Sequence, residues 1–415
     1  MSLYLDHSGY YGTTEICITG SKSESNRLLI IQSLYEGIAI KNLSNSDDTR
    51  FLKNALVSDE ATIDIHHAGT AMRFLTAYFA IKEGREIRLT GSKRMTERPI
   101  GILVDALRTL GADIEYAQQE GYPPLVIRGK QLTKNQVSLK ANVSSQYISA
   151  LMLIGAALPQ GLQIILDGKI TSVPYIEMTV TLLKQCGISV SFEGQRIQIE
   201  PFENKAISRT IAVESDWSSV SYFYSIAAIV FGRKEHDHYP TIKISSYHQK
   251  SIQGDAVLQD IYKQLGVTSR FEGNTLCLEK NENFKSVAHI QLDLSNAPDI
   301  AQTITVTCLG LGLGCKLRGL HTLKIKETDR LEALQNEITK LGGDISVTED
   351  TLILKPQEKA LSENVTIETY NDHRMAMAFA PLALNTPLYI KEAAVVSKSY
   401  PDFWKDMQGL GFHVS

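Results

Sequence analysis

Long apolar segments alternate with amphipathic segments along the whole chain. Each apolar segment is followed by strand-like residues, an amphipathic segment with helical spacing, and more strand-like residues. The arrangement recurs six times, at intervals of about 70 to 80 residues except for a shorter first interval. The apolar segments begin near Ser25, Gly69, Ser144, Asp216, Pro298 and Asp372. The pattern predicts an α/β protein in which one supersecondary unit is repeated.

The amphipathic segments end at a glycine in five of the six copies. Glycine accommodates the left-handed conformation that commonly ends a helix. These glycines are Gly111, Gly187, Gly266, Gly342 and Gly411, and the first copy, around residues 51–57, has none. The apolar segments are hydrophobic on nearly all sides, which indicates helices enclosed by protein. We therefore expect buried helices surrounded by amphipathic helices and strands.

The chain is too long for one hydrophobic core. Its 415 residues predict two domains. Copies one to three occupy residues 20–213 and copies four to six the remainder, with a boundary near Glu214. No Pro-rich or Gly/Ser-rich linker separates the halves, so we expect short crossings that act as hinges and allow closure on a ligand.

Composition narrows the class of protein. The chain has 43% hydrophobic and 21% charged residues, as in ordinary globular proteins, and its net charge of -4 argues against nucleic-acid binding. The five cysteines lack metal-binding spacing, which favours reduced thiols in the cytoplasm. The N-terminus lacks a signal-peptide pattern, and residues 147–158 are too few to span a membrane.

Polar and charged residues gather where the predicted helices begin. A helix N-terminus presents unpaired N–H groups and a partial positive charge, so it favours anions. The alternative for each Ser, Thr or Asp is a helix cap. At the apolar helices, these residues are Lys22, Ser23, Arg27, Gly69, Thr70, Ser144, Ser145, Gln146, Asp299, His373 and Arg374. At the amphipathic helices, they are Arg98, Ser172, Tyr175, Lys326, Glu327, Arg330 and Lys398.

Basic residues at helix starts run against the helix dipole, which favours acidic residues there. An anionic ligand supplies a reason, because arginine grips carboxylate or phosphate with a bidentate fork and lysine acts as a point charge. Each basic residue taken alone reads as a solvated surface cation. Their recurrence at one structural position favours a polyanion site that needs no metal.

Three other motif interpretations are weaker. Gly20-Ser21-Lys22-Ser23 lacks the upstream glycine of a phosphate loop, which argues against an ATP-dependent kinase. The glycines at 310, 312 and 314 follow a helix and do not form a dinucleotide fingerprint. Asp47-Asp48 has no third ligand at useful spacing, and a helix cap explains it better than a metal.

Six motifs occur in order along the chain: residues 20–27 (GSKSESNR), 68–73 (AGTAMR), 97–101 (ERPIG), 143–146 (VSSQ), 326–330 (KETDR) and 371–377 (NDHRMAM). Together they resemble the 3-phosphoshikimate 1-carboxyvinyltransferase family of enolpyruvyl transferases, over nearly the entire chain. The resemblance implies two inside-out α/β barrel domains, each with three βαβαββ-type repeats, that close over the substrates. It also implies that the N-terminal strand joins the C-terminal domain, so that residues 1–19 belong with 214–415.

The resemblance further implies an activity and a set of binding residues. The reaction transfers the enolpyruvyl group of phosphoenolpyruvate to the 5-hydroxyl of shikimate 3-phosphate and releases phosphate, within the shikimate pathway to chorismate and aromatic amino acids. A monomer without cofactor or metal is expected. Residues implied for shikimate 3-phosphate are Lys22, Ser23, Arg27, Ser144, Ser145, Gln146, Ser172, Tyr175, Asp299 and Lys326. Those implied for phosphoenolpyruvate are Lys22, Gly69, Arg98, Gln146, Arg330, Arg374 and Lys398.

The implied addition–elimination needs one acid and one base. Glu327 is the candidate that protonates the methylene carbon, and Asp299 is the candidate base for the hydroxyl proton. Lys22 is an alternative participant, and the cations stabilise the charge of the transition state. Taken alone, Glu327 reads as a salt bridge to Arg330 three residues on, and Asp299 as a residue stabilised by the helix dipole.

Three positions depart from the family's pattern. His67 and Thr322 stand where asparagine is common, and Phe74 stands where proline is common. Phe74 is expected to shift the helix that carries Gly69 and to alter sensitivity to phosphoenolpyruvate mimics such as glyphosate.

Two other functions remain open. An enolpyruvyl transferase acting on UDP-N-acetylglucosamine is expected to carry a reactive cysteine near Arg98, but the chain has none between Cys17 and Cys186. A noncatalytic anion-binding homologue is disfavoured by the presence of Glu327, Asp299 and Lys22.

Overall fold

A computed structural model describes residues 2–7, 14–141, 144–203, 206–233, 241–285 and 287–415. The chain divides into two compact units. The N-terminal unit is Gly20–Val213, and the C-terminal unit combines Met1–Thr19 with Glu214–Ser415. Val143 of the VSSQ motif lies outside the described residues.

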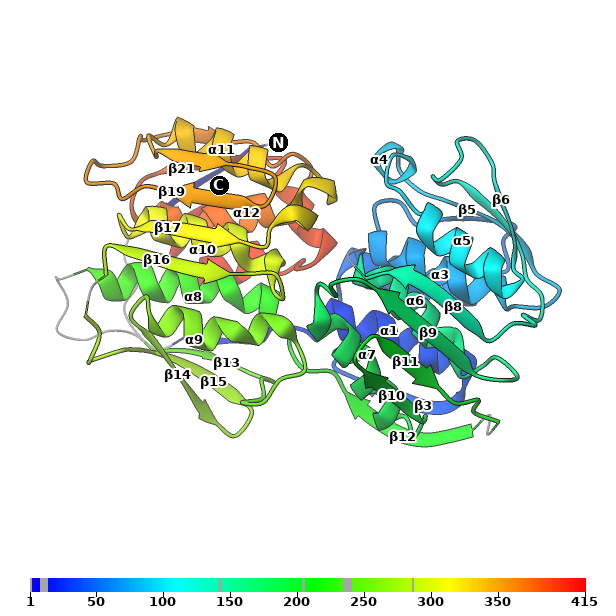
Figure 1. The fold of residues 1–415 in the computed structure, drawn as a ribbon. Helices are drawn as coiled ribbons and strands as arrows, with labels where there is room; N and C mark the ends of the chain where they lie inside the picture. Colours follow the sequence, from blue (N-terminus) through cyan, green and yellow to red (C-terminus); the bar gives the residue numbers. More distant parts are fainter. Residues whose placement is uncertain (1, 8–13, 142–143, 204–205, 234–240, 286) are drawn as a thin grey trace. The chain divides into compact units, whose positions relative to one another are not determined.

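Sheets form the outer layer of the N-terminal unit (Figure 1). One sheet is a parallel pair of β3 (Glu36–Lys41) and β12 (Ala206–Ala212). The second has the order β4 (Thr62–Asp64), β5 (Glu86–Thr90), β7 (Leu125–Arg128) and β6 (Asp113–Tyr116). The third has the order β10 (Val190–Glu193), β11 (Arg196–Ile199), β9 (Leu162–Asp167) and β8 (Gln136–Lys140). The first copy of the repeat thus contributes a single strand to its sheet, which accounts for the shorter first interval.

Three apolar helices fill the interior of the N-terminal unit. α1 (Lys22–Leu34), α3 (Gly69–Ala80) and α6 (Ser145–Gly155) contact one another, and every residue of α3 is buried. The amphipathic helices α2 (Asp47–Val57), α5 (Gly101–Leu110) and α7 (Val173–Gln185) each contact two of them, and α4 (Lys93–Thr96) is a single turn. The prediction of enclosed apolar helices is confirmed.

The C-terminal unit repeats this plan with three four-stranded sheets. The first has the order β14 (Val267–Glu272), β15 (Thr275–Lys280), β13 (Ile242–Ile244) and β2 (Thr14–Ile16). The second has the order β16 (His289–Asp293), β17 (Gly314–Arg318), β19 (Thr351–Leu354) and β18 (Ile345–Val347). The third has the order β20 (Val365–Ile367), β21 (Leu388–Lys391), β1 (Ser2–His7) and β22 (Phe412–Val414). Each contains one parallel pair, as do the two four-stranded sheets of the N-terminal unit.

The apolar helices of the C-terminal unit are α8 (Trp217–Gly232), α10 (Ala301–Gly310) and α12 (His373–Phe379), and α10 contacts both of the others. Around them lie α9 (Leu258–Lys263), α11 (Arg330–Lys340) and α13 (Phe403–Gly409). The described residues of this unit also form five 3₁₀ helices: η1 (Gly254–Val257), η2 (Pro298–Ile300), η3 (His321–Ile325), η4 (Ala380–Leu384) and η5 (Ala393–Lys398). Apolar side chains from the helices and strands of this unit form one continuous core. Among the described residues, no helix is both long enough and apolar enough to cross a bilayer.

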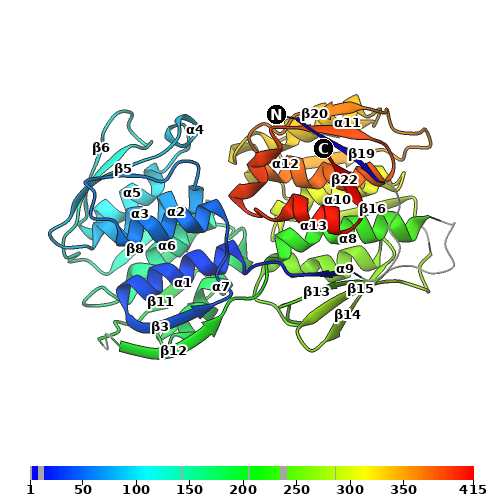
Figure 2. The same ribbon diagram turned by 180° about the vertical axis from the view of Figure 1, so that it is seen from behind.

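The N-terminal strand β1 lies inside the last sheet of the C-terminal unit. Its register pairs Leu5 with Leu388 of β21 on one side and with Val414 of β22 on the other. Figure 2 shows both chain termini in this region of the unit. Because β1 is flanked by two antiparallel neighbours, both edges of its backbone are hydrogen-bonded.

The glycine stops occur where the pattern places them. Gly111, Gly187, Gly266, Gly342 and Gly411 have φ of 109°, 84°, 89°, 91° and 87°. Each follows a helix and adopts a conformation that costs other residues free energy. The five predicted helix ends are confirmed.

Several predicted helix starts are wrong by a few residues. α1 begins at Lys22, because Ser21 caps it by accepting from the Glu24 N–H, so Arg27 lies in the second turn. Ser46, rather than Asp47 or Asp48, caps α2. Lys398 ends η5 and does not open α13.

Candidate active site

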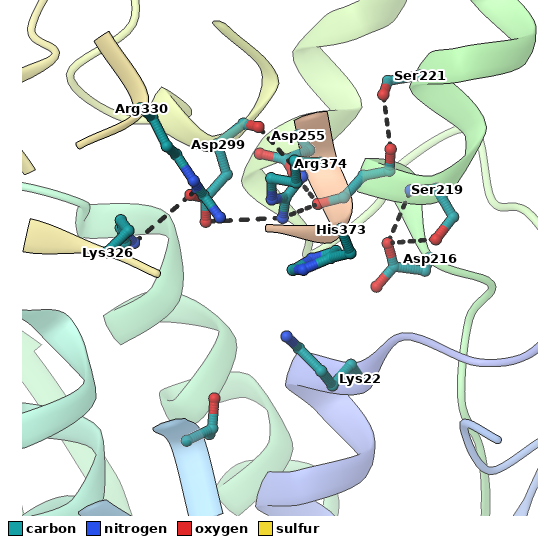
Figure 3. A network of polar contacts seen from close by, with 12 residues as sticks. Lys22, Asp216, Ser219, Ser221, Asp255, Asp299, Lys326, Arg330, His373 and Arg374 are labelled. Atoms are coloured by element: carbon teal, nitrogen blue, oxygen red, sulfur yellow. Dashed lines mark hydrogen bonds and ion pairs between the residues drawn. The ribbon is translucent and has the colours of Figure 1, made fainter. Parts of the chain in front are cut away.

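Asp299 is the centre of a charged cluster in the C-terminal unit (Figure 3). Its Oδ1 lies 2.7 Å from Nη1 of Arg330 and 3.4 Å from Nζ of Lys326. Its Oδ2 lies 3.8 Å from Nη2 of Arg374, and Nη1 of Arg374 donates to the Asp299 carbonyl at 3.1 Å. Asp299 lies on η2, Arg374 on α12 and Arg330 at the start of α11, and Lys326 precedes α11. Four residues chosen from the sequence thus meet at one place.

Arg330 is enclosed by three carboxylates. Besides Asp299, it donates from Nε to Asp372 Oδ2 at 2.6 Å and from Nη2 to Glu327 Oε2 at 2.9 Å. Its side chain is 2% exposed. Arg330 is the first residue of α11, whose cap is Asp329. The positive charge of Arg330, which is unfavourable at a helix start, is therefore balanced by acidic side chains and not by solvent.

Glu327 lies between two cations. Its Oε1 is 2.7 Å from Nζ of Lys398, and its Oε2 is 2.9 Å from Nη2 of Arg330. The expected salt bridge to Arg330 is present, but the Glu327 side chain is only 13% exposed. The sequence alone suggests a surface ion pair, which would contribute little free energy. A largely buried carboxylate between two cations is costly to disrupt.

The charges in this cluster shift one another's proton affinity. Burial would raise the pKa of Asp299, but Lys326, Arg374 and Arg330 hold it well below its usual range. Burial lowers the pKa of the Lys326 ammonium more strongly than Asp299 raises it. Against burial, Asp372, Glu327 and Asp299 raise the pKa of Arg330. In this arrangement Asp299 is an acceptor of hydrogen bonds rather than a strong base.

Arg27 joins three helices of the N-terminal unit. Its Nε donates to Thr179 Oγ1 at 2.8 Å, its Nη2 to Ser149 Oγ at 2.9 Å, and its Nη1 to the Ser23 carbonyl at 2.7 Å. Nη2 also lies 3.4 Å from the Tyr175 carbonyl. Desolvation by burial lowers the pKa of the guanidinium to about 10. Because one Nη1 hydrogen remains beyond these contacts, Arg27 offers a ligand at most a single N–H, not a fork.

Gly69 and Arg98 lie in close contact at the start of α3. A Cβ added at Gly69 would lie 2.5 Å from Nη1 of Arg98, so glycine is needed for this approach. Arg98 is 8% exposed, and its Nε is buried with no hydrogen-bond partner among the described residues. The neighbouring Arg73, by contrast, donates to the carbonyls of Gly69 and Pro99. Arg98 is thus a buried cation with capacity for an anionic ligand.

The start of α6 contacts the start of α3. Ser144 caps α6 through the Gln146 N–H, and the Gln146 side chain donates to Thr70 Oγ1 at 3.3 Å. Ser145 is buried in the first turn. Gln146 therefore connects two helix N-termini, and its contact with Thr70 was not predicted.

Ser172 precedes α7 in a left-handed conformation, with φ of 55°. This is an uncommon state for serine, and such strain is frequent at functional sites. α7 begins at Val173, so Tyr175 lies within its first turn and not before it. Lys22 is the first residue of α1, and its Nζ lies 3.9 Å from Asp48 Oδ2.

The three departures from the expected pattern have distinct surroundings. Phe74 is buried, and the guanidinium carbon of Arg27 lies 5.5 Å from its ring centroid. His67 Nε2 lies 3.9 Å from Asp47 Oδ2. The Thr322 hydroxyl is buried without a hydrogen-bond partner among the described residues.

Sequence reasoning missed the role of Asp372. It stands in the NDHRM motif and caps α12 by accepting from the Arg374 N–H at 2.9 Å while it also binds Arg330. The signal was an acidic residue beside two basic ones at a helix start. In the described part of the chain, no group of three or more His, Cys, Asp or Glu side chains could hold a metal ion.

Comparison with known proteins adds independent information. The family model described as EPSP synthase (3-phosphoshikimate 1-carboxyvinyltransferase) matches residues 51–407. A 3-phosphoshikimate 1-carboxyvinyltransferase of Bacteroides fragilis is 45% identical over 403 residues, covering 96% of this chain and 95% of the relative. One from Haemophilus influenzae is 34% identical over 426 residues, covering 95% and 96%.

Solved structures share the fold. An EPSP synthase from Acinetobacter baumannii has a TM-score of 0.79 at 21% identity and covers 100% of this chain and 99% of its own. The enolpyruvyl transferase NikO from Streptomyces tendae has a TM-score of 0.72 at 15% identity and covers 100% and 98%. These similarities confirm the predicted two-domain α/β fold class.

Proposed function

Because the chain belongs to the EPSP synthase (3-phosphoshikimate 1-carboxyvinyltransferase) family, we propose that it transfers the enolpyruvyl group of phosphoenolpyruvate to the 5-hydroxyl of shikimate 3-phosphate. Phosphate is the second product. The observation that carries this proposal is the charged cluster of the C-terminal unit, which gathers four cations and three carboxylates. The cations are Lys326, Arg330, Arg374 and Lys398, and the carboxylates are Asp299, Glu327 and Asp372.

In the proposed complex, phosphoenolpyruvate binds through its two anionic groups. We assign its carboxylate to Arg330 and Arg374. Since Asp372, Glu327 and Asp299 already engage most N–H groups of Arg330, we assign Arg330 a single hydrogen bond to that carboxylate. Arg98, Lys22, Lys398, the Gly69 backbone and Gln146 hold its phosphate. Arg98 is the best supported of these residues, because it is buried and its Nε has no hydrogen-bond partner in the part of the chain that the structure describes.

For shikimate 3-phosphate we propose the contacts that the family resemblance implies. Ser144, Ser145 and Ser172 take its phosphate, with Lys22 and Tyr175 nearby, and Gln146 packs on its ring. Ser23 and Arg27 take its carboxylate, and Lys326 and Asp299 its hydroxyls. Since most N–H groups of Arg27 are already engaged within the protein, we assign it a single hydrogen bond to this ligand.

The proton transfers fall to Glu327 and Asp299. Glu327 gives a proton to the methylene carbon of phosphoenolpyruvate while the 5-hydroxyl attacks the neighbouring carbon and Asp299 accepts the hydroxyl proton. This addition forms the tetrahedral intermediate. In the second step the Glu327 carboxylate takes a proton back from the new methyl group as phosphate leaves, which restores the double bond, and Asp299 gives its proton to the departing phosphate. The cations stabilise the developing negative charge. Lys22 is the alternative participant in proton transfer.

Substrate binding resolves the weak basicity of Asp299. In the free protein, Lys326, Arg374 and Arg330 hold its pKa low. A substrate carboxylate on Arg330 and Arg374 offsets part of that positive charge, which raises the proton affinity of Asp299. The base therefore becomes competent once phosphoenolpyruvate is bound.

We also propose that the protein works as a monomer in the cytoplasm. All five cysteines are free, as in a reducing compartment. Among the described residues, the exposed large apolar side chains Val57, Ile102 and Ile325 lie on three separate elements. Light scattering of the purified protein tests the oligomeric state.

The direct test of function is phosphate release from a mixture of purified protein, shikimate 3-phosphate and phosphoenolpyruvate, with a chelator present. We expect turnover that depends on both substrates. Glu327→Gln and Asp299→Ala should each reduce kcat by about a hundredfold or more. Unchanged rates in both variants would refute the assigned proton transfers.

The same assay separates the alternative functions. Turnover with UDP-N-acetylglucosamine in place of shikimate 3-phosphate would assign the chain to the other enolpyruvyl transfer reaction. Binding of both ligands without any phosphate release would indicate a noncatalytic anion-binding protein.

A further inference from the structure

Asp255 is a buried carboxyl group that the proposed reaction does not use. It lies on η1 and is 4% exposed. Its Oδ2 accepts a hydrogen bond from the Ser218 hydroxyl in the first turn of α8. Its Oδ1 is buried with no hydrogen-bond partner in the described part of the chain. A buried carboxyl with one unsatisfied oxygen is costly, which calls for a compensating role.

Ser218 connects this carboxyl to Arg374. Nη2 of Arg374 donates to Ser218 Oγ at 3.2 Å (Figure 3 shows Arg374 and Asp255). A serine hydroxyl has one proton and two lone pairs. Because an ionised Asp255 can only accept hydrogen bonds, the Ser218 hydroxyl donates its proton to Asp255. The lone pairs of the Ser218 oxygen are then available to accept from the Arg374 guanidinium.

The other side of Arg374 is held by η2. Nη1 donates to the Asp299 carbonyl at 3.1 Å, and Nη2 lies 3.8 Å from Asp299 Oδ2. The guanidinium plane is thus fixed by a carbonyl on one nitrogen and by the Ser218 hydroxyl on the other. Loss of the Ser218 contact would remove one of these constraints and favour rotation of the guanidinium toward the Asp299 carboxylate.

We propose that Asp255 is a positioning residue that, through the Ser218 hydroxyl, holds Arg374 in the orientation in which it receives the carboxylate of phosphoenolpyruvate. The inference rests on the proposed function, in which Arg374 binds that carboxylate. Asp255 itself touches neither substrate. Its effect is to keep Ser218 an acceptor and to keep the Arg374 fork off the Asp299 carboxylate.

The surrounding charges make this link sensitive to pH. Burial raises the pKa of Asp255 to about 6, while Arg374 of α12 lowers it, Asp299 of η2 raises it, the Ser218 hydrogen bond lowers it and Asp216 before α8 raises it. The charged residues of the adjoining α9, Asp260 and Lys263, are exposed. Once protonated, Asp255 can donate to Ser218, whose hydroxyl is then no longer held as an acceptor toward Arg374.

Steady-state kinetics for both substrates test the proposal. Asp255→Ala and Ser218→Ala should each raise KM for phosphoenolpyruvate about tenfold and leave KM for shikimate 3-phosphate unchanged. The double variant should be no worse than either single variant, because both act on one contact. Asp260→Asn removes an exposed carboxylate nearby and should change neither constant. Unchanged KM for phosphoenolpyruvate, or fully additive effects, would overturn the proposal.

A second measurement uses the isosteric Asp255→Asn, which guards against a variant that fails to fold. In the unmodified protein, kcat/KM for phosphoenolpyruvate should fall below about pH 6, where phosphate esters also titrate. In the variant, the pH profile of kcat/KM should lack the titration of Asp255 and keep the titration of the substrate phosphate. Superimposable pH profiles would contradict the role of Asp255.

These outcomes are distinct from a failure of the proposed function. If the unmodified protein shows no turnover, the function itself is wrong. If Arg374→Ala leaves KM for phosphoenolpyruvate unchanged, the assignment of Arg374 is wrong. If the protein shows turnover and Arg374→Ala raises KM for phosphoenolpyruvate, but the Asp255 variants behave as the unmodified protein, only the inference about Asp255 fails.

Discussion

Nε of Arg330 donates to Oδ2 of Asp372 at 2.6 Å, and both side chains are buried, at 2% and 0% exposure. The same carboxylate caps α12 through the Arg374 N–H. The Asp372 carboxylate therefore fixes two arginines that are proposed to bind one substrate carboxylate. It binds the guanidinium of Arg330 and the backbone N–H of Arg374. A site built this way positions both arginines before the ligand arrives.

Replacement of Asp372 should be severe. Asp372→Asn keeps a good helix cap but removes the charge opposite a buried guanidinium, so we expect a loss of about 3 to 5 kcal/mol in the free energy of unfolding. KM for phosphoenolpyruvate should rise as well. Denaturant unfolding measures the first effect and steady-state kinetics the second.

Asp329→Asn is the matched control, because Asp329 also caps a helix but is not buried. It should cost well under about 1 kcal/mol. Equal losses in the two variants would mean that capping, and not the buried ion pair, explains the effect.

Gly69→Ala and Arg98→Ala should have related effects on phosphoenolpyruvate. The added Cβ at Gly69 would lie 2.5 Å from Arg98 Nη1 and push the guanidinium away. We expect KM for phosphoenolpyruvate to rise roughly tenfold in Gly69→Ala and by about ten- to a hundredfold in Arg98→Ala. Arg94→Ala, at an exposed arginine paired with Glu97, should leave it unchanged. A normal KM in Arg98→Ala would exclude Arg98 from the phosphate site.

Phe74 should affect the shikimate side through Arg27. Phe74→Leu removes the ring that lies 5.5 Å from the Arg27 guanidinium carbon, a cation–π contact of about 0.5 to 2 kcal/mol. KM for shikimate 3-phosphate should rise severalfold. Phe79→Leu, at another buried phenylalanine of α3, should cost similar stability without that rise. Identical kinetic constants for the two variants would contradict the link to Arg27.

The same residue tests sensitivity to glyphosate. Phe74→Pro removes a backbone N–H within α3 and should bend the helix that begins at Gly69. We expect the inhibition constant of glyphosate to change relative to the unmodified protein, as an inhibition assay at fixed phosphoenolpyruvate would show. Equal inhibition constants would count against an influence of Phe74.

Asp255 should lower stability at neutral pH. Its folded pKa is about 6 against a usual 3.8, so the native state binds the proton more tightly than the unfolded chain does. The free energy of unfolding therefore decreases as pH rises from about 4 to about 6, by at most about 3 kcal/mol. Asp255→Asn should raise Tm at about pH 7.5 and give little gain at about pH 4.5. Thermal unfolding at the two pH values checks this, and an equal gain at both would contradict it.

Local chemistry made much of the fold predictable. Gly111 and Gly187 end helices in a conformation with positive φ. This conformation depends on the glycine itself, so the helix ends could be predicted from the sequence. The enclosed character of α3 follows equally from its apolar composition. Exact helix starts depend on which hydroxyl or carboxylate caps the helix, so Ser21 and Ser46 displaced the expected starts.

Pairing between distant residues was less accessible. Arg330 and Asp372 are 42 positions apart, and no periodicity connects them. The sequence marked Arg27 as a ligand-binding cation, yet it did not show that Thr179, 152 positions later, engages its Nε. Which buried cations keep free N–H groups for a ligand is decided by tertiary contacts, as the contrast between Arg27 and Arg98 shows.

The placement of β1 between β21 and β22 constrains the order in which a ribosome can deliver a folded molecule. Residues 20–213 emerge as one contiguous stretch that holds all three of its sheets. β1 must instead wait for β22, since the Tyr4 N–H bonds to the carbonyl of Ser415. The third sheet of the C-terminal unit can therefore be completed only after residues 412–415 have been synthesised.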